Sequence, residues 1–167
     1  MALTEILVNE HKTVLEKLDR LQEAVTDGDR QAAGALLSFF EFDLQLHRRK
    51  EEEVLFPALG EHIGVDSGPV ACMLEEHAKE KTLLRDLRAA IEQAGSAPPL
   101  RRATDAFVSH LRLHIQKENE VLFPMAENLL PPEQKELVFD GMRRIGSCCA
   151  ACSGGHDKQG AAKRPKR

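Results

Sequence analysis

An eleven-residue segment occurs twice in this 167-residue chain, and this repeat limits the possible folds more than any other feature. Residues 47–57 align with residues 114–124, and eight of the eleven positions are identical. A weaker echo precedes each copy, because the Glu-His dipeptide at positions 10–11 occurs again at positions 76–77. The repeat therefore predicts two related halves, each with an upstream His followed by a His-x-x-x-Glu motif.

Apolar residues recur at three- and four-residue steps through most of the chain, which is the pattern of amphipathic helices. Turn-forming residues interrupt this pattern at three places, 26–29, 60–69 and 95–99. The pattern predicts helices over about 3–25, 30–59, 69–94, 100–130 and 132–145. No segment shows the alternation expected of a strand. We therefore predict an all-α fold, an up-down-up-down four-helix bundle with a short C-terminal fifth helix.

The composition divides the chain into two parts. We expect residues 1–145 to form the bundle and residues 146–167 to form a flexible tail, because Cys, Gly, Ala and Lys dominate after Gly146. The tail contains a Cys-x-x-Cys spacing, which admits a redox or metal-binding role as well as no role. The cysteines concerned are Cys148, Cys149 and Cys152.

Charge and composition also exclude several classes of function. From His156 onward there are five basic residues and one acidic residue, which leaves 18 basic and 26 acidic residues elsewhere, a net charge of −8. Such an acidic body argues against a nucleic-acid partner. The N-terminus resembles no secretory signal and no apolar run could cross a membrane, so we expect a cytoplasmic protein. The absence of Tyr and Trp argues against chemistry through aromatic radicals.

Helix geometry indicates what the repeated motif can do. A residue four positions along a helix returns to within about 40° of the first, so His47 and Glu51 share one face, as do His114 and Glu118. Glu52 is rotated away from that face. Buried imidazoles and carboxylates are costly unless they are paired or bind metal, and this combination is typical of di-iron and di-manganese bundles. A single such motif would suggest a surface pair, but its duplication favours a metal site.

These residues carry a resemblance to the hemerythrin-like, or HHE cation-binding, family over about residues 3–130. The chain has the family's ligand order, and Leu-Phe-Pro follows each His-x-x-x-Glu pair. The resemblance implies two iron ions, or manganese as the alternative, with an oxo or hydroxo bridge, bridging carboxylates and terminal histidines. The metal ligands it implies are His11, His47, Glu51, His77, His114 and Glu118.

One departure from the family pattern bears on function. Oxygen-carrying hemerythrins have His-x-x-x-His on the third helix and His-x-x-x-x-Asp last, whereas Met73 and Lys81 flank His77 here and Glu118 ends the second motif. The four-His, two-Glu pattern argues against simple reversible oxygen storage. We expect binding or sensing of a small oxidant (dioxygen, nitric oxide or peroxide) or of iron. The alternative is a di-iron enzyme that disproportionates peroxide or carries out metal-centred oxidation.

Other residues admit more than one interpretation. Asp43 and His110 occupy matching positions one turn before the two motifs, and each could be a further ligand, a group that orients a ligand, or a partly exposed polar residue. The prolines at positions 57 and 124 predict that each helix bends or ends there. Phe56 and Phe123 either wall off the metal pocket or simply pack in the core. His62 is expected to face solvent.

Overall fold

The computed structural model describes residues 2–93 and 97–146. The predictions about the three C-terminal cysteines and about a flexible tail concern residues 147–167, which lie outside the described residues. Within the described ranges the chain is almost entirely helical and contains no strand, so the all-α prediction is confirmed. None of the described helices is long and apolar enough to cross a membrane.

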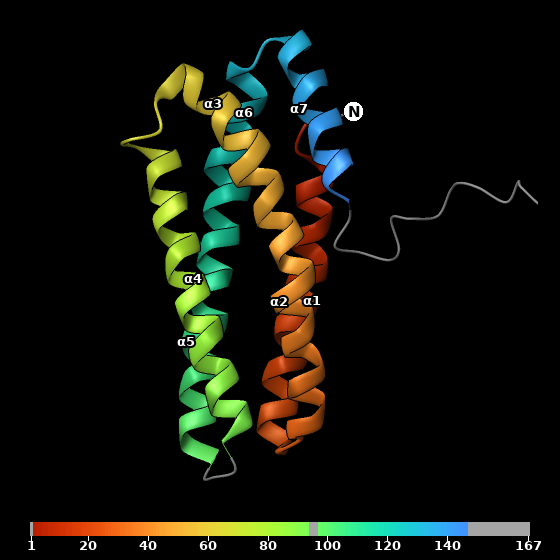
Figure 1. Cartoon of the computed structure of the whole chain (residues 1–167), viewed down its shortest axis with the longest axis vertical. Helices are drawn as coiled ribbons and strands as arrows, with labels where there is room; N and C mark the ends of the chain where they lie inside the picture. Colours follow the sequence, from red (N-terminus) through yellow and green to blue (C-terminus); the bar gives the residue numbers. More distant parts are fainter. Residues whose placement is uncertain (1, 94–96, 147–167) are drawn as a thin grey trace, which may run out of the picture.

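Four long helical rods run side by side along the longest axis of the molecule (Figure 1). The second and fourth rods each consist of an α-helix, a short π-helical turn and a second α-helix, and a further short helix follows the fourth rod. The elements are α1 (Glu5–Asp27), α2 (Arg30–Lys50), η1 (Glu51–Leu55), α3 (Phe56–Ile63), α4 (Pro69–Glu92), α5 (Ala97–Lys117), η2 (Glu118–Leu122), α6 (Phe123–Leu129) and α7 (Pro132–Ile145).

Two helix boundaries differ from the prediction. The second rod continues past Leu59 to Ile63, because the apolar Ile63 packs against the core and extends the buried face by one turn. The helix α5 begins at Ala97, although two prolines follow directly. Proline is tolerated in the first turn of a helix, where its missing N–H would have no helical partner.

Both π-helical turns lie directly after the repeated motifs. The Phe56 N–H donates to the carbonyl of Glu51, five residues back, and the Phe123 N–H donates likewise to Glu118. The next residue in both copies is a proline, which cannot donate and whose ring would clash with the carbonyl four residues back in a regular α-helix. A widened turn accommodates the proline and lets the helix continue. The alternative that the helices end at these prolines is therefore wrong.

The apolar core forms two clusters, separated by a polar layer. One, here called the Phe40 cluster, occupies the half of the bundle near the α1–α2 turn and includes Leu18, Phe40, Leu87 and Phe107. The other, the Phe123 cluster, includes Leu7, Phe56, Leu59, Phe123 and Val138. Along every rod the chain passes from one cluster to the other through a segment that carries buried His or Glu residues.

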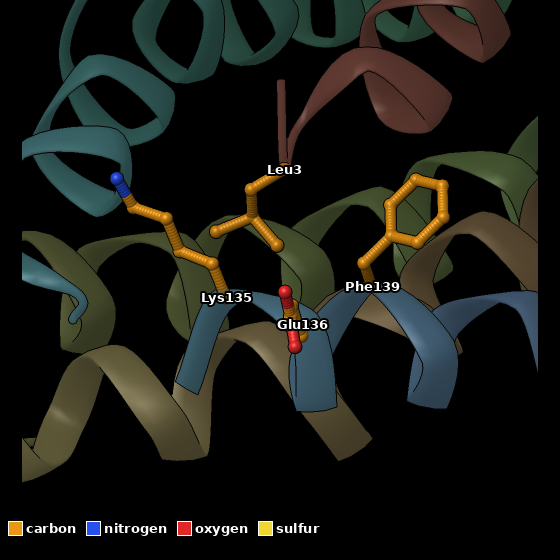
Figure 2. Close-up of a pocket in the computed structure, with 4 residues that line it drawn as sticks. All are labelled: Leu3, Lys135, Glu136 and Phe139. Atoms are coloured by element: carbon orange, nitrogen blue, oxygen red, sulfur yellow. The ribbon is translucent and has the colours of Figure 1, made fainter. Parts of the chain in front are cut away.

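The helix α7 packs across α2 and η1 of the first repeat. The contact is close at Gly141, where an added Cβ would lie 2.9 Å from Val54 Cγ1, so a glycine is needed there. At the N-terminus, Leu3 lies over Lys135 and Phe139 of α7, beside a small pocket (Figure 2). That pocket is lined by Leu3, Phe139, Lys135 and Glu136, and none of these residues belongs to the buried His and Glu cluster.

Candidate metal centre

Four histidines and two glutamates from the four rods meet in the polar layer of the bundle. The helices α1 and α4 each contribute one His, whereas the second and fourth rods each contribute a His and, one turn later, a Glu. All six residues are between 0% and 3% exposed. They are the six residues that the sequence singled out: His11, His47, Glu51, His77, His114 and Glu118.

Each of the two glutamates lies between one histidine of the pair His11 and His47 and one histidine of the pair His77 and His114. Glu51 places one oxygen 3.1 Å from His47 Nε2 and the other 3.3 Å from His77 Nε2. Glu118 does the same with His11, at 3.1 Å, and with His114, at 3.3 Å. The donor atoms therefore form two groups of four, each within 4.8 Å of one another, and both glutamates belong to both groups.

Several buried nitrogen and oxygen atoms of this layer lack a hydrogen-bond partner in the part of the chain that the structure describes, and a metal ion would satisfy them. Among the described residues, both oxygens of Glu51 and of Glu118, and Nε2 of His11 and of His47, have no hydrogen-bond partner. Each buried unpaired polar group costs about 1–3 kcal/mol. Two atoms bound to one ion at about 2.1 Å and at right angles lie about 3 Å apart, close to the nitrogen–oxygen distances given above. Two bridged cations fit this donor set.

In the absence of a cation the cluster holds protons. Burial alone would lower the pKa of His47, but the Glu51 carboxylate and its neighbours outweigh burial and raise the pKa to about 9. The same balance raises the pKa of His77 to about 9. Burial and the nearby positive charge of His47 lower the pKa of His11 to about 3. Burial and the Glu51 charge raise the pKa of Glu118 well above its usual value.

Metal binding at neutral pH is expected to release the protons of His47 and His77. Both rings have a pKa of about 9 without metal and must be neutral to coordinate an ion. The apparent metal affinity should therefore rise as the pH increases toward 9 and fall in acid. Isothermal titration calorimetry in two buffers of different ionisation enthalpy counts the released protons. A binding heat that does not depend on the buffer would contradict this expectation.

Hydrogen bonds within each hairpin orient two of the four rings. The Nδ1–H of His47 donates to Glu10, and that of His114 donates to Glu76, both at 2.9 Å. Each of these carboxylates belongs to the residue directly before the upstream His of its own hairpin. An acceptor at Nδ1 leaves Nε2 as the free lone pair that faces the other donors, which is the usual support of a metal-binding histidine.

The other two rings are held from the opposite hairpin. The Nδ1–H of His77 donates to Glu52 at 2.8 Å, and that of His11 donates to Asn119 at 2.9 Å. Glu52 and Asn119 are the residues directly after the two buried glutamates. Sequence analysis placed Glu52 away from the centre and gave it no function. The repeated Glu-His dipeptide was the available signal for the other two supports, but nothing in the sequence indicated contacts between hairpins.

Two lysines at matching positions of the repeat pair with the supporting carboxylates. Lys50 donates to Glu10, and Lys117 donates to Glu76. The Lys50 side chain is only 1% exposed, whereas that of Lys117 is 50% exposed. This difference agrees with the position of α7, which packs on the end of α2. Sequence analysis did not predict the buried lysine.

The remaining sequence candidates lie around the centre rather than in it. His110 and Asp43 belong to neither donor group, and the His110 Nε2–H donates to the backbone carbonyl of Glu76 at 3.0 Å. Phe56 stacks on His77 with ring centroids 5.6 Å apart, and Phe123 stacks on His11 at 5.3 Å. Because both phenylalanines also belong to the Phe123 cluster, the two interpretations given to them hold together.

His62 is exposed, as expected, and contacts Gln134 of α7 at 2.8 Å. It belongs to α3 rather than to a loop, because the second rod extends to Ile63. The ring lies on the surface side of that helix and has no connection with the buried donors.

The fold and the two linked donor groups define a class, the four-helix bundles that hold cations between His and carboxylate side chains. Comparison with protein families agrees with this class. The model of the hemerythrin HHE cation-binding domain matches residues 2–126, and the chain belongs to this family. The resemblance identified from the sequence motifs is thereby confirmed, and family membership together with the His and Glu cluster indicates iron binding.

Several curated relatives carry the name iron-sulfur cluster repair protein YtfE. The protein of Pectobacterium carotovorum subsp. carotovorum is 29% identical over 119 residues, which cover 66% of this chain and 53% of the relative. The protein of Cronobacter sakazakii is 29% identical over 141 residues, covering 74% and 64%. The chain therefore spans about half to two thirds of the length of these relatives. No solved structure matches it significantly.

Proposed function

We propose that this cytoplasmic protein holds two iron ions and binds or senses a small oxidant such as dioxygen, nitric oxide or peroxide. The main support is that two groups of four donor atoms share both glutamates. Manganese is the alternative metal, because it accepts the same nitrogen and oxygen donors. The proposed ligands are His11, His47, Glu51, His77, His114 and Glu118.

Bound iron would supply electrons and exchangeable coordination positions to a small molecule. The four residues of each group would hold one ion and would leave coordination positions for a small molecule. The hydrogen bonds at Nδ1 hold the four imidazoles in place. The apolar clusters on either side of the polar layer limit access to small molecules and exclude bulk water.

Two other functions have some support. The same donor set would serve an enzyme that disproportionates peroxide or carries out a metal-centred oxidation, because exchangeable positions suit turnover as well as binding. The name of the curated relatives suggests a part in iron-sulfur cluster repair. That suggestion rests on relatives less than 30% identical, which are longer than this chain.

Metal analysis of the natively purified protein, followed by absorption spectroscopy, tests the proposal. We expect two irons per chain and a spectrum of the reduced protein that changes on addition of air, nitric oxide or peroxide. A stable adduct without turnover favours a binding protein, whereas rapid consumption of peroxide favours the enzyme. His114→Gln should lose iron, and His62→Gln, at an exposed ring, is the matched control. An iron content far below two that does not rise on reloading would contradict the proposal.

A further inference from the structure

The supports of the four imidazoles differ at one point between the two halves of the bundle. Three rings donate from Nδ1 to a carboxylate, whereas His11 donates to the neutral amide oxygen of Asn119. Glu52 is the residue that occupies the matching position in the first repeat. The two contacts have nearly equal lengths, 2.8 Å and 2.9 Å, so the difference between them is one of charge.

We propose that the two metal positions are unequal, that the ion between His77 and His114 binds first, and that the exchange of Glu52 for Asn119 sets this order. The proposal rests on the proposed dinuclear site and deepens it. Glu52 and Asn119 are positioning residues in this proposal, because each acts through the imidazole that it accepts a hydrogen bond from.

The physical reason is the charge on the acceptor. A carboxylate that accepts from Nδ1–H makes the imidazole a stronger donor at Nε2, and changes to such partners typically alter metal affinity by about 10–100-fold. An asparagine at the same place holds the ring but adds no negative charge. The position between His77 and His114 therefore has two carboxylate supports, whereas the position between His11 and His47 has one.

Charged groups around these supports do not cancel the difference. Lys81 lies 3.4 Å from the Glu52 carboxylate, but its side chain is 54% exposed and solvent screens its charge. Lys50 is buried against Glu10, whereas the matching Lys117 is half exposed beside Glu76. The buried lysine offsets the negative charge on its own side more completely, which again leaves the His77 and His114 side more negative.

A buried ion pair near His77 also leaves the balance unchanged. Arg48 pairs with Glu80, and both side chains are at most 8% exposed. The matching positions in the other half of the repeat are the apolar Ile115 and Val14. Because Arg48 and Glu80 carry opposite charges, the pair adds no net charge to its side. The main difference between the two positions therefore lies at Glu52 and Asn119, and the deeper burial of Lys50 acts in the same direction.

The test moves the negative charge from position 52 to position 119 with little change in side-chain shape. The double variant Glu52→Gln, Asn119→Asp keeps the size of both side chains and the net charge of the protein. The probe is Zn²⁺, a diamagnetic divalent ion that accepts imidazole nitrogen and carboxylate oxygen. With ¹⁵N-labelled histidine, the seven imidazoles can be followed individually by NMR and assigned by single substitutions.

With one equivalent of Zn²⁺, the Nε2 resonances of His77 and His114 should shift first in the wild type. In the double variant those of His11 and His47 should shift first. Asn119→Asp alone should make the two pairs shift together, and it serves as the second test should the double variant fold poorly. We expect the first ion to bind about 10-fold or more tightly than the second in the wild type.

Three results would overturn the inference. Both pairs could shift together in the wild type, the His11 and His47 pair could shift first, or the wild-type order could persist in both variants. In each of these cases two Zn²⁺ ions still bind, and the proposed dinuclear site stands. If no imidazole shifts at two equivalents in any variant, the proposed function itself fails, and the inference fails with it.

Discussion

Glu118→Gln is expected to remove most of the stabilisation of this protein by divalent metal while leaving the metal-free protein about as stable as the wild type. Burial and the Glu51 charge raise the pKa of Glu118 well above its usual value, so the metal-free protein favours the neutral acid form of this side chain. An amide has the same shape and the same charge as that acid. The substitution therefore costs little until a cation requires the second carboxylate.

The expected effect in the presence of metal is large. Wild-type protein with free metal at 100 times its Kd gains about 2.7 kcal/mol of stability. The variant keeps the Glu51 carboxylate but loses the one whose oxygens lie 3.1 and 3.3 Å from Nε2 of His11 and of His114. We expect its gain to fall below about 1 kcal/mol under the same conditions.

Differential scanning calorimetry of the two proteins, with and without anaerobic Fe²⁺, measures both parts of this prediction. Glu120→Gln is the matched control, because Glu120 lies two residues away, is exposed and belongs to neither donor group. A Glu118→Gln protein that gains as much stability from Fe²⁺ as the wild type would remove this carboxylate from the proposed ligands. A large loss of stability in the metal-free variant would show that the acid is ionised there.

Lys50→Met is expected to destabilise the metal-free protein by about 3–5 kcal/mol, the usual cost of removing one partner of a buried ion pair. Both side chains of this pair are only 1% exposed, so the Glu10 carboxylate stays buried and keeps the hydrogen bond from His47 but loses the ammonium. The same change at the matching position, Lys117→Met, should cost at most about 1 kcal/mol, because that ion pair faces solvent.

Urea unfolding of the two variants, followed by circular dichroism, gives the comparison directly. The repeat supplies the control, because the two lysines share sequence context and pair with equivalent glutamates. Adding Glu10→Gln to the Lys50→Met variant should recover part of the lost stability, since an amide has no negative charge for the missing ammonium to offset. Equal losses for the two lysine variants would contradict the expectation that burial makes the Lys50 ion pair more important to stability than the Lys117 pair.

Much of the fold and the main features of the site follow from the sequence because both depend on helix periodicity. The 3.6-residue period places a His and a Glu four residues apart on one helix face, and the repeat produces that face twice. An antiparallel bundle then brings such faces to one level of the interior. For this reason His47, Glu51, His114 and Glu118 could be predicted before any coordinates.

Whether a helix continues past a proline was harder to predict from the sequence. Proline inside a helical pattern usually ends or kinks the helix. At Pro57 and Pro124, however, a π-helical turn before each proline keeps the rod continuous. The wider turn depends on the packing of Phe56 and Phe123 against the core, which stabilises the segment beyond it. The sequence alone gives no measure of that packing.

The sequence by itself determined the helical bundle, its repeated motif and the six buried donors, because these features depend on local spacing along each helix. Only the tertiary structure decided which groups support the donors. Glu52 reaches His77, and Asn119 reaches His11, across two different hairpins. Such contacts depend on the rotation and depth of neighbouring helices, which spacing within one helix does not define. The burial of Lys50 against Glu10 likewise depends on how α1 and α2 pack together.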